Sequence, residues 1–241
     1  MAAYRTPPRA RYDGRVQRRF DAVIFDFDYT LADSSRAVVE CANTALRALR
    51  LPEASEHDIC RTIGLALPET LARLAGEQHR HRATEFRQHW RRRSDEIMVA
   101  WTQVYPYVPA ALEGLKQCKL GIGIVSTKYR SRIEAVLGRE GLAHYFEAIV
   151  GGEDVEAFKP DPQGLLACLE RLAVPRSRAL YVGDSITDAE TAQGAGLPFL
   201  AVLSGKTRRE EFAAYPVESV LDTVADVSEW VECRRAHPSA R

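Results

Sequence analysis

Residues 21–35 read DAVIFDFDYTLADSS, and this stretch decides the fold. Residues 22–25 are continuously apolar, which is typical of a strand buried on both faces of a parallel sheet. Asp26 and Asp28 follow, and because side chains two apart in a strand point the same way, both carboxylates would face one pocket if the strand continued regularly. Like charges repel when they share a site, so this pair predicts a place where a cation or a ligand binds.

Three further apolar runs have the same form. They are LGIGIVST, ALYVGDS and FLAVLSG, at residues 120–127, 179–185 and 199–205, and each ends in small or polar residues. Helical patterns lie around them at residues 129–141, 161–174 and 186–196. Strands that alternate with helices predict an α/β fold with a doubly wound, Rossmann-like parallel sheet.

The first two strands are separated by about ninety residues, far more than an ordinary crossover contains. Within this gap the pattern is helical throughout residues 34–101, and no strand-like run interrupts it. The simplest interpretation is a small α-helical cap inserted after the first strand. The domain prediction is therefore a basic, disordered tail (1–19), an α/β core (20–33 and 102–232), a helical cap (34–101) and a second tail (233–241).

The composition excludes several classes of protein. Hydrophobic residues make up 46% of the 241 residues and charged residues 27%, so a packed core is expected rather than global disorder. Lys plus Arg number 33 and so do Asp plus Glu, which gives no overall attraction to nucleic acid or to an anionic membrane. No apolar run approaches the roughly 20 residues that span a bilayer. The five cysteines contain no CxxC pair and indicate reduced thiols. We expect a cytoplasmic monomer or homodimer without nucleic-acid or membrane partners.

The polar and charged residues that could carry out chemistry lie at the ends of the predicted strands. Ligands of open α/β sheets bind beyond the carboxyl ends of the strands. The residues at these ends and in the loops that follow are Asp26, Asp28, Ser126, Thr127, Lys159, Asp184 and Asp188. Mg²⁺ prefers oxygen ligands and commonly lies between carboxylates and phosphate oxygens, and a lysine adds positive charge. This set predicts a receptor for a phosphoryl group, in which a carboxylate can also act as a nucleophile.

These residues resemble the four motifs of the haloacid dehalogenase superfamily. DFDYT at residues 26–30 matches the DxDxT signature. Ser126 closing GIGIVS, Lys159 in KPDP and GDSITD at residues 183–188 complete the set in the family's order. The resemblance covers about residues 21–230, so it extends over nearly all of the chain except the tails.

The resemblance implies a role for each position. Asp26 corresponds to the nucleophile, and Asp28 to the general acid that protonates the leaving oxygen and later activates water. The implied Mg²⁺ ligands are Asp26, Asp28 through its backbone carbonyl, and Asp184, with Asp188 supporting the metal site from its edge. The groups implied to hold the phosphoryl oxygens and the substrate are Ser126, Thr127 and Lys159.

The helical region resembles the cap of one branch of that superfamily. TIGLALPETL, residues 62–71, is similar to a cap loop that lies over the active site, so Thr62 and Gly64 are predicted substrate contacts. Tyr29 departs from the pattern, because many relatives have glycine there, and its phenol either narrows the pocket entrance or packs outward. Phe158 is bulkier than is usual before the motif lysine.

The layout resembles phosphoglycolate phosphatases most, so the predicted function is hydrolysis of a small phosphorylated metabolite. Related inorganic pyrophosphatases and sugar-phosphate mutases remain alternatives. A non-catalytic relative that binds a partner through the helical cap or the tail is an alternative of another class. The run HRHRATEFRQHWRRR, residues 79–93, lacks metal-ligand spacing, and we interpret Arg91, Arg92 and Arg93 as a solvated helix face.

Overall fold

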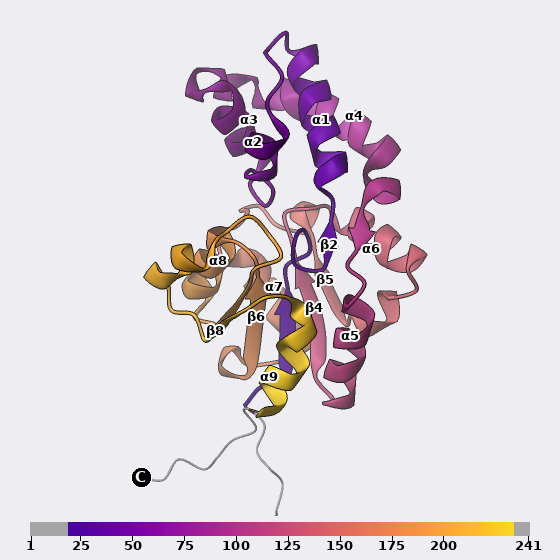
Figure 1. Ribbon diagram of the computed structural model, residues 1–241, viewed down its shortest axis with the longest axis vertical. Helices are drawn as coiled ribbons and strands as arrows, with labels where there is room; N and C mark the ends of the chain where they lie inside the picture. Colours follow the sequence, from indigo (N-terminus) through magenta and orange to yellow (C-terminus); the bar gives the residue numbers. More distant parts are fainter. Residues whose placement is uncertain (1–18, 234–241) are drawn as a thin grey trace, which may run out of the picture.

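Six parallel strands form the main sheet of the protein, in the order β5-β4-β1-β6-β7-β8. The computed structural model describes residues 19–233, so apart from Arg19 and Cys233 both predicted tails lie outside the described residues. The strands of this sheet are β1 (Ala22–Phe25), β4 (Gly121–Val125), β5 (Ala148–Val150), β6 (Ala179–Gly183), β7 (Phe199–Val202) and β8 (Ser219–Leu221). The predicted doubly wound α/β fold is confirmed (Figure 1).

The four predicted strands correspond to β1, β4, β6 and β7. The edge strands β5 and β8 were not predicted, because each has only three residues and no apolar run long enough to be noticed. Helices predicted around the sheet are present as α6 (Arg130–Arg139), α7 (Gln163–Leu172) and α8 (Ile186–Ala195).

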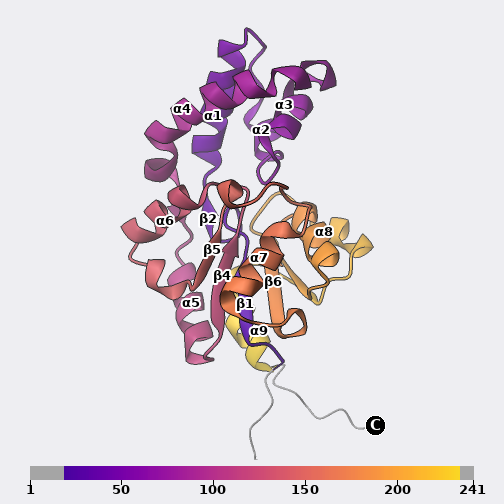
Figure 2. The same cartoon turned by 180° about the vertical axis from the view of Figure 1, so that it is seen from behind.

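Helices cover both faces of the sheet, as a doubly wound fold requires. Helices α5 (Val108–Gln117), α6 and α9 (Val227–Cys233) share one buried cluster with the sheet, and α7 and α8 share another. Figure 1 shows α9 in front of the sheet, and Figure 2, from behind, shows α7 in front of it. Val23 and Phe25 belong to the first cluster and Ile24 to the second, so β1 is buried on both faces. Each such side chain contributes roughly 1.5–3 kcal/mol of burial free energy.

The helical region stands apart from this sheet and has a buried cluster of its own. We call residues 34–101 the helical insertion; its helices are α1 (Ser35–Ala48), α2 (Glu56–Cys60), α3 (Leu67–Ala75) and α4 (Ala83–Trp101). Leu46, Phe86 and Trp90 are among the side chains of its cluster. Figure 1 shows the insertion beyond one end of the strands.

A two-stranded ribbon joins the insertion to the sheet, and the sequence did not predict it. Strand β2 (Ala32–Asp33) enters the insertion, and β3 (Gln103–Val104) leaves it as the antiparallel partner of β2. Both connections therefore run side by side. Short 3₁₀ helices complete the described chain: η1 (Glu77–Arg82), η2 (Ala143–Tyr145), η3 (Gly152–Asp154), η4 (Arg176–Arg178), η5 (Arg209–Ala214) and η6 (Val224–Asp226).

The sheet order places a ligand crevice beside β1. The chain runs from β1 through β4 to β5 on one side, then crosses back to continue through β6, β7 and β8 on the other. Where strand order reverses, the loops diverge and leave room for a ligand at the carboxyl ends. Phe25 of β1 is in register with Val182 of β6, so the residues that follow each strand emerge next to one another.

Two features of the described residues bear on the class of protein. Cys41, Cys60, Cys118 and Cys168 are buried and form no disulfide. Between residues 19 and 233, none of the helices combines the length and the apolar character needed to cross a membrane.

Candidate active site

Three buried carboxylates meet at the ends of β1 and β6. Asp26, Asp184 and Asp188 each offer an oxygen, and these oxygens all lie within 4.8 Å of one another. The three residues are 4%, 6% and 1% exposed. Lys159 enters from the loop before α7, and its Nζ lies 2.6 Å from Asp26 Oδ1 and 2.7 Å from Asp188 Oδ1. The structure thus brings together the motif residues from three distant segments.

Asp188 is held by its own helix as well as by Lys159. Ser185 is the N-cap of α8: its Oγ accepts a hydrogen bond from the backbone N–H of Asp188 at 3.2 Å. The Ser185 backbone N–H and hydroxyl donate in return to Asp188 Oδ2, which completes a capping box. Tyr181 also donates its hydroxyl to Asp188 Oδ1 at 2.7 Å. Both Asp188 oxygens therefore already accept hydrogen bonds.

The Asp184 carboxylate accepts fewer hydrogen bonds than that of Asp188, and the backbone passes close to it. Its Oδ1 accepts a long hydrogen bond of 3.4 Å from Thr30 Oγ1. A Cβ atom on Gly205, in the loop after β7, would lie 1.8 Å from Asp184 Oδ2, so only glycine lets this loop pass the carboxylate. The two oxygens of Asp184 thus keep lone pairs that a cation could use.

The electrostatics of the cluster call for more positive charge than Lys159 supplies. Burial raises the pKa of Asp26 to about 7, Lys159 opposes the rise, and repulsion from Asp188 adds to it. Burial and repulsion from Asp188 and Asp26 likewise raise the pKa of Asp184 well above its usual value. Burial lowers the pKa of Lys159, but attraction to Asp188 and Asp26 outweighs it and raises that pKa. The all-oxygen donor set, with Asp26 and Asp184 foremost, fits a hard divalent cation.

Asp28 does not belong to this cluster, because the strand does not continue regularly to it, which was the condition for both carboxylates to face one pocket. Strand β1 ends at Phe25, three residues before Asp28, so the alternation of strand side chains no longer applies there. The Asp28 carboxylate accepts a 2.6 Å hydrogen bond from Ser34 Oγ and lies 3.2 Å from Lys128 Nζ. Its carboxylate lies outside the group that could hold a metal, which leaves only its backbone carbonyl for the implied ligand role.

Lys128, at the end of the second predicted strand, lies at the site although the sequence analysis assigned it no role. Its side chain is 5% exposed and its Nζ lies 3.2 Å from Met98 Sδ of α4 as well as beside Asp28. Its position two residues after Ser126 was the available signal. Ser126 Oγ accepts a 3.3 Å hydrogen bond from the Lys128 backbone N–H, and Thr127 lies between them in the same loop.

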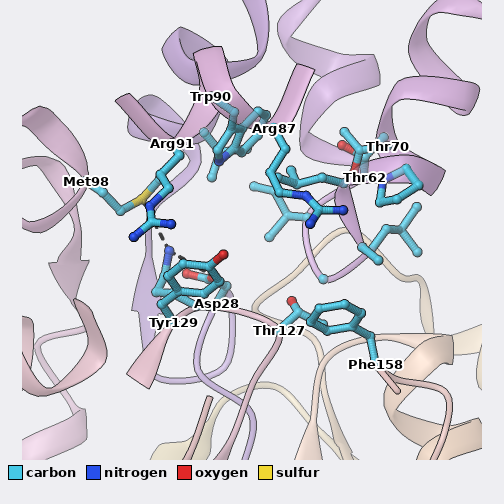
Figure 3. Close-up of a pocket in the computed structure, with 18 of the residues that line it drawn as sticks. Asp28, Thr62, Thr70, Arg87, Trp90, Arg91, Met98, Thr127, Tyr129 and Phe158 are labelled. Carbon is cyan, nitrogen blue, oxygen red and sulfur yellow. Dashed lines mark hydrogen bonds and ion pairs between the residues drawn. The ribbon is translucent and has the colours of Figure 1, made fainter. Parts of the chain in front are cut away.

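A cavity of about 130 Å³ opens between the helical insertion and the loops of the sheet (Figure 3). Asp28 and Thr127 line it from the sheet side, and the predicted contacts Thr62 and Gly64 line it from the insertion. The Thr62 hydroxyl donates to the backbone carbonyl of Ile59 at 2.7 Å, so it already has a partner. Ser126 and Lys159 line a smaller neighbouring hollow rather than this cavity.

Two sequence interpretations change with the geometry. Tyr29 neither narrows this cavity nor packs outward: it is 4% exposed and absent from the cavity lining. Its φ of 63° lies in the left-handed region, which glycine adopts more readily than tyrosine does. Arg91 lines the cavity, whereas Arg93 binds Glu40 and Glu96, so the arginine run is not a single solvated face.

Comparison with known proteins identifies the family. Residues 23–202 match the haloacid dehalogenase-like hydrolases, which is most of the chain. This chain belongs to that family. Phosphoglycolate phosphatase from Yersinia pseudotuberculosis is 32% identical over 209 residues, and that from Salmonella paratyphi A is 28% identical over 226 residues. Each alignment covers 85% of this chain and 90% of the relative.

A solved structure extends the comparison. The crystal structure of a haloacid dehalogenase-like hydrolase from Bacteroides fragilis is 40% identical and superposes with a TM-score of 0.83. It covers 86% of this chain and 99% of that protein. The predicted membership of the haloacid dehalogenase family and the predicted resemblance to phosphoglycolate phosphatases are both confirmed.

The raised pKa of Asp26 in this hydrolase predicts a pH-dependent stability. The folded chain keeps a proton on Asp26 between its ordinary pKa of 3.8 and about 7, where the unfolded chain has lost it. The contribution of Asp26 to the free energy of unfolding is therefore greatest below pH 3.8 and declines as the pH rises toward about 7. Asn at this position cannot titrate. In EDTA, the Tm of Asp26→Asn relative to that of wild type should therefore increase as the pH rises from 3.8 to about 7.

Thermal melts of both proteins over this pH range measure the effect. Asp222→Asn is the control, because Asp222 is highly exposed and its melting curve should follow wild type. A constant difference between the Asp26→Asn and wild-type Tm at every pH would contradict the prediction.

Proposed function

We propose that this hydrolase is a Mg²⁺-dependent phosphatase that cleaves a small phosphate monoester through an aspartyl-phosphate on Asp26. The observation that carries the proposal is the buried contact between Asp26 and Lys159 within the cluster of Asp184 and Asp188. The similarity to phosphoglycolate phosphatases over 85% of the chain supports it. The small phosphorylated metabolite would be the partner of this chain.

The reaction uses the two aspartates in turn. A carboxylate oxygen of Asp26 attacks phosphorus, and the bond from phosphorus to the leaving oxygen breaks as Asp28 gives that oxygen a proton. Asp28 then takes a proton from water, which attacks the aspartyl-phosphate and releases inorganic phosphate and free Asp26. Hydrogen bonding from Ser34 and the contact with Lys128 hold Asp28 in place for both steps.

Positioning and charge neutralisation supply most of the catalysis in phosphoryl transfer. Lys159 touches Asp26, so it can hold a phosphoryl oxygen while it screens the charge of the nucleophile. Ser126 and Thr127 follow β4, the strand next to β1, and they offer hydroxyl and backbone N–H groups to the same phosphoryl group. We assign these three residues to phosphoryl binding.

The donor set supports Mg²⁺ as the cation. Asp26 and Asp184 would hold it with the backbone carbonyl of Asp28, and Asp188 would steady the site from its edge through Lys159. Bound there, Mg²⁺ neutralises the carboxylates and the phosphoryl oxygens and orients the phosphoryl group for in-line attack.

We further propose that residues 34–101 act as a cap over a core of residues 20–33 and 102–232. The cavity between the two parts, lined by Thr62 and Gly64 on the cap side, supports this division. A cap excludes water from the reacting groups and shapes the space for the leaving group. Buried thiols such as Cys41 and Cys168 support an assignment to the cytoplasm, where thiols stay reduced.

The Asp26→Asn variant tests the proposed nucleophile. With p-nitrophenyl phosphate and Mg²⁺, we expect kcat/KM to fall by about 10³-fold or more, since only binding and electrostatic assistance remain. The matched control Asp222→Asn should retain wild-type phosphate release. Equal rates for wild type and Asp26→Asn would end the phosphatase proposal.

Asp28→Asn tests the proton transfer to the leaving oxygen. A basic leaving group needs that proton in the transition state and an acidic one does not. The loss in kcat should therefore be greater for alkyl phosphates than for p-nitrophenyl phosphate. A series of esters with leaving groups of graded basicity measures this, and a uniform loss across the series would remove Asp28 from the acid role.

Metal binding can be followed without turnover. Mg²⁺ that binds only the folded chain should raise its Tm, because a ligand at 100 times its Kd stabilises by about 2.7 kcal/mol. Asp184→Asn removes a proposed ligand, so the rise in Tm should be lost, whereas Asp222→Asn should keep it. An undiminished Mg²⁺ effect in Asp184→Asn would show that the cation binds elsewhere.

A further inference from the structure

The cavity beneath the helical insertion is strongly cationic. Four of the side chains that line it are basic, and Asp28 is the one acidic residue in its lining. The basic side chains are Arg87, Arg91, Lys128 and Arg132. Such an excess of positive charge beside a phosphoryl site favours a substrate with a further negative group.

The basic residues differ in whether they are already neutralised. Lys128 lies beside Asp28, and Arg132 donates to Asp95 at 2.6 Å. Arg87 and Arg91 have no carboxylate partner among residues 19–233. Their guanidinium groups are therefore available to an anionic ligand.

Arg87 and Arg91 lie one turn apart on α4, so they project from the same side of the helix. Figure 3 shows the Arg87 side chain extending from α4 toward the middle of the cavity, and the Arg91 side chain lies above Tyr129. The Arg91 guanidinium lies 5.8 Å from the centre of the Tyr129 ring, which steadies it at the cavity wall. Two planar guanidinium groups in this arrangement suit a carboxylate or a phosphate.

The rest of the lining is largely apolar and large enough for a ring. Ile63, Leu67, Trp90 and Met98 line the cavity from the insertion, and Phe158 lines it from the sheet side with 38% of its surface exposed. A volume of about 130 Å³ is close to the engineered cavity of about 150 Å³ that holds benzene. The two-carbon leaving group of phosphoglycolate would leave much of this space unfilled.

We propose that the cavity selects a phosphate ester whose leaving group has an apolar body of about the size of a six-membered ring and ends in an anionic group bound by Arg87 and Arg91. This inference rests on the proposed function for the position of the phosphoryl group. It narrows that function from small phosphate esters in general to one chemical class.

Three alcohol phosphates separate the two parts of the inference. They are para-carboxybenzyl phosphate, its neutral amide para-carbamoylbenzyl phosphate, and phosphoglycolate. All three release a primary alcohol, so leaving-group basicity differs little among them. We expect wild type to prefer the carboxybenzyl ester over the amide by about tenfold or more in kcat/KM, as a charge-assisted hydrogen bond allows. The carboxybenzyl ester should also exceed phosphoglycolate.

Variants assign the preference to its residues. Arg87→Gln and Arg91→Gln should each reduce the preference for the acid over the amide, with the larger loss for the acid, because a neutral group gains less from a guanidinium than a carboxylate does. Arg92→Gln is the matched control, since Arg92 is next on the same helix, contacts His89 and does not line the cavity. It should keep the wild-type preference.

Binding measured by calorimetry keeps the inference separate from the proposed chemistry. Asp26→Asn protein with Mg²⁺ should bind the carboxybenzyl ester about tenfold more tightly than the amide, even if wild type hydrolyses neither. Equal affinity for acid and amide would overturn the anion site, and tighter binding of phosphoglycolate would overturn the ring-sized body. Lack of turnover with the binding preference intact would instead contradict the proposed phosphatase activity alone.

Discussion

The structure depends on one buried cation, the Lys159 ammonium group, placed among three buried carboxylates. It contacts Asp26 and Asp188 directly, while Asp184 completes the cluster without a lysine contact of its own. Leaving an ionised carboxylate buried without a partner is costly, so a fold that assembles three of them must neutralise them or let them bind protons. One lysine is not enough, and the raised pKa values of Asp26 and Asp184 express the remaining imbalance. A cluster with this charge imbalance is compatible with binding a divalent cation.

The fold creates this cluster with parts that also stabilise it. Asp188 caps the first turn of α8 together with Ser185, so one carboxylate contributes to helix stability and to the orientation of Lys159. Tyr181, from the middle of β6, donates to Asp188 and lies 3.0 Å from Lys159, which ties the cluster to the core of the sheet. Side chains held from two elements lose little further freedom when a ligand binds, as a preorganised site requires.

Sequence alone predicted the parts of this protein that local patterns encode. Apolar runs located the long central strands, the residues after them named Asp26, Asp184 and Asp188, and the KPDP stretch before a predicted helix named Lys159. The pairing of Asp28 with Lys128 could not be predicted, because it depends on where β1 ends and on the position of the loop after β4 beside it. The direction of Arg91 was also beyond the sequence, since only the packing of α4 against α1 and the sheet loops decides which of three consecutive arginines faces the cavity. Short edge strands such as β5 carry too few residues for any pattern to form.

The two aspartates of the first motif end in different surroundings, each with a lysine of its own. Asp26 lies 2.6 Å from Lys159 in the acidic cluster, and Asp28 lies 3.2 Å from Lys128 at the border of the cationic cavity. Strand β1 ends at Phe25, before both aspartates, and the positive φ of Tyr29 turns the chain only after Asp28. Under the proposed mechanism, the carboxylate in the cluster would attack phosphorus and the carboxylate at the cavity would serve the leaving oxygen, so two chemically identical side chains would have different tasks because their surroundings differ. Lys128 also reaches Met98 of α4, so the environment of Asp28 depends on the helical insertion being in place. If Asp28 transfers the proton as proposed, this contact would link that step to the helical insertion.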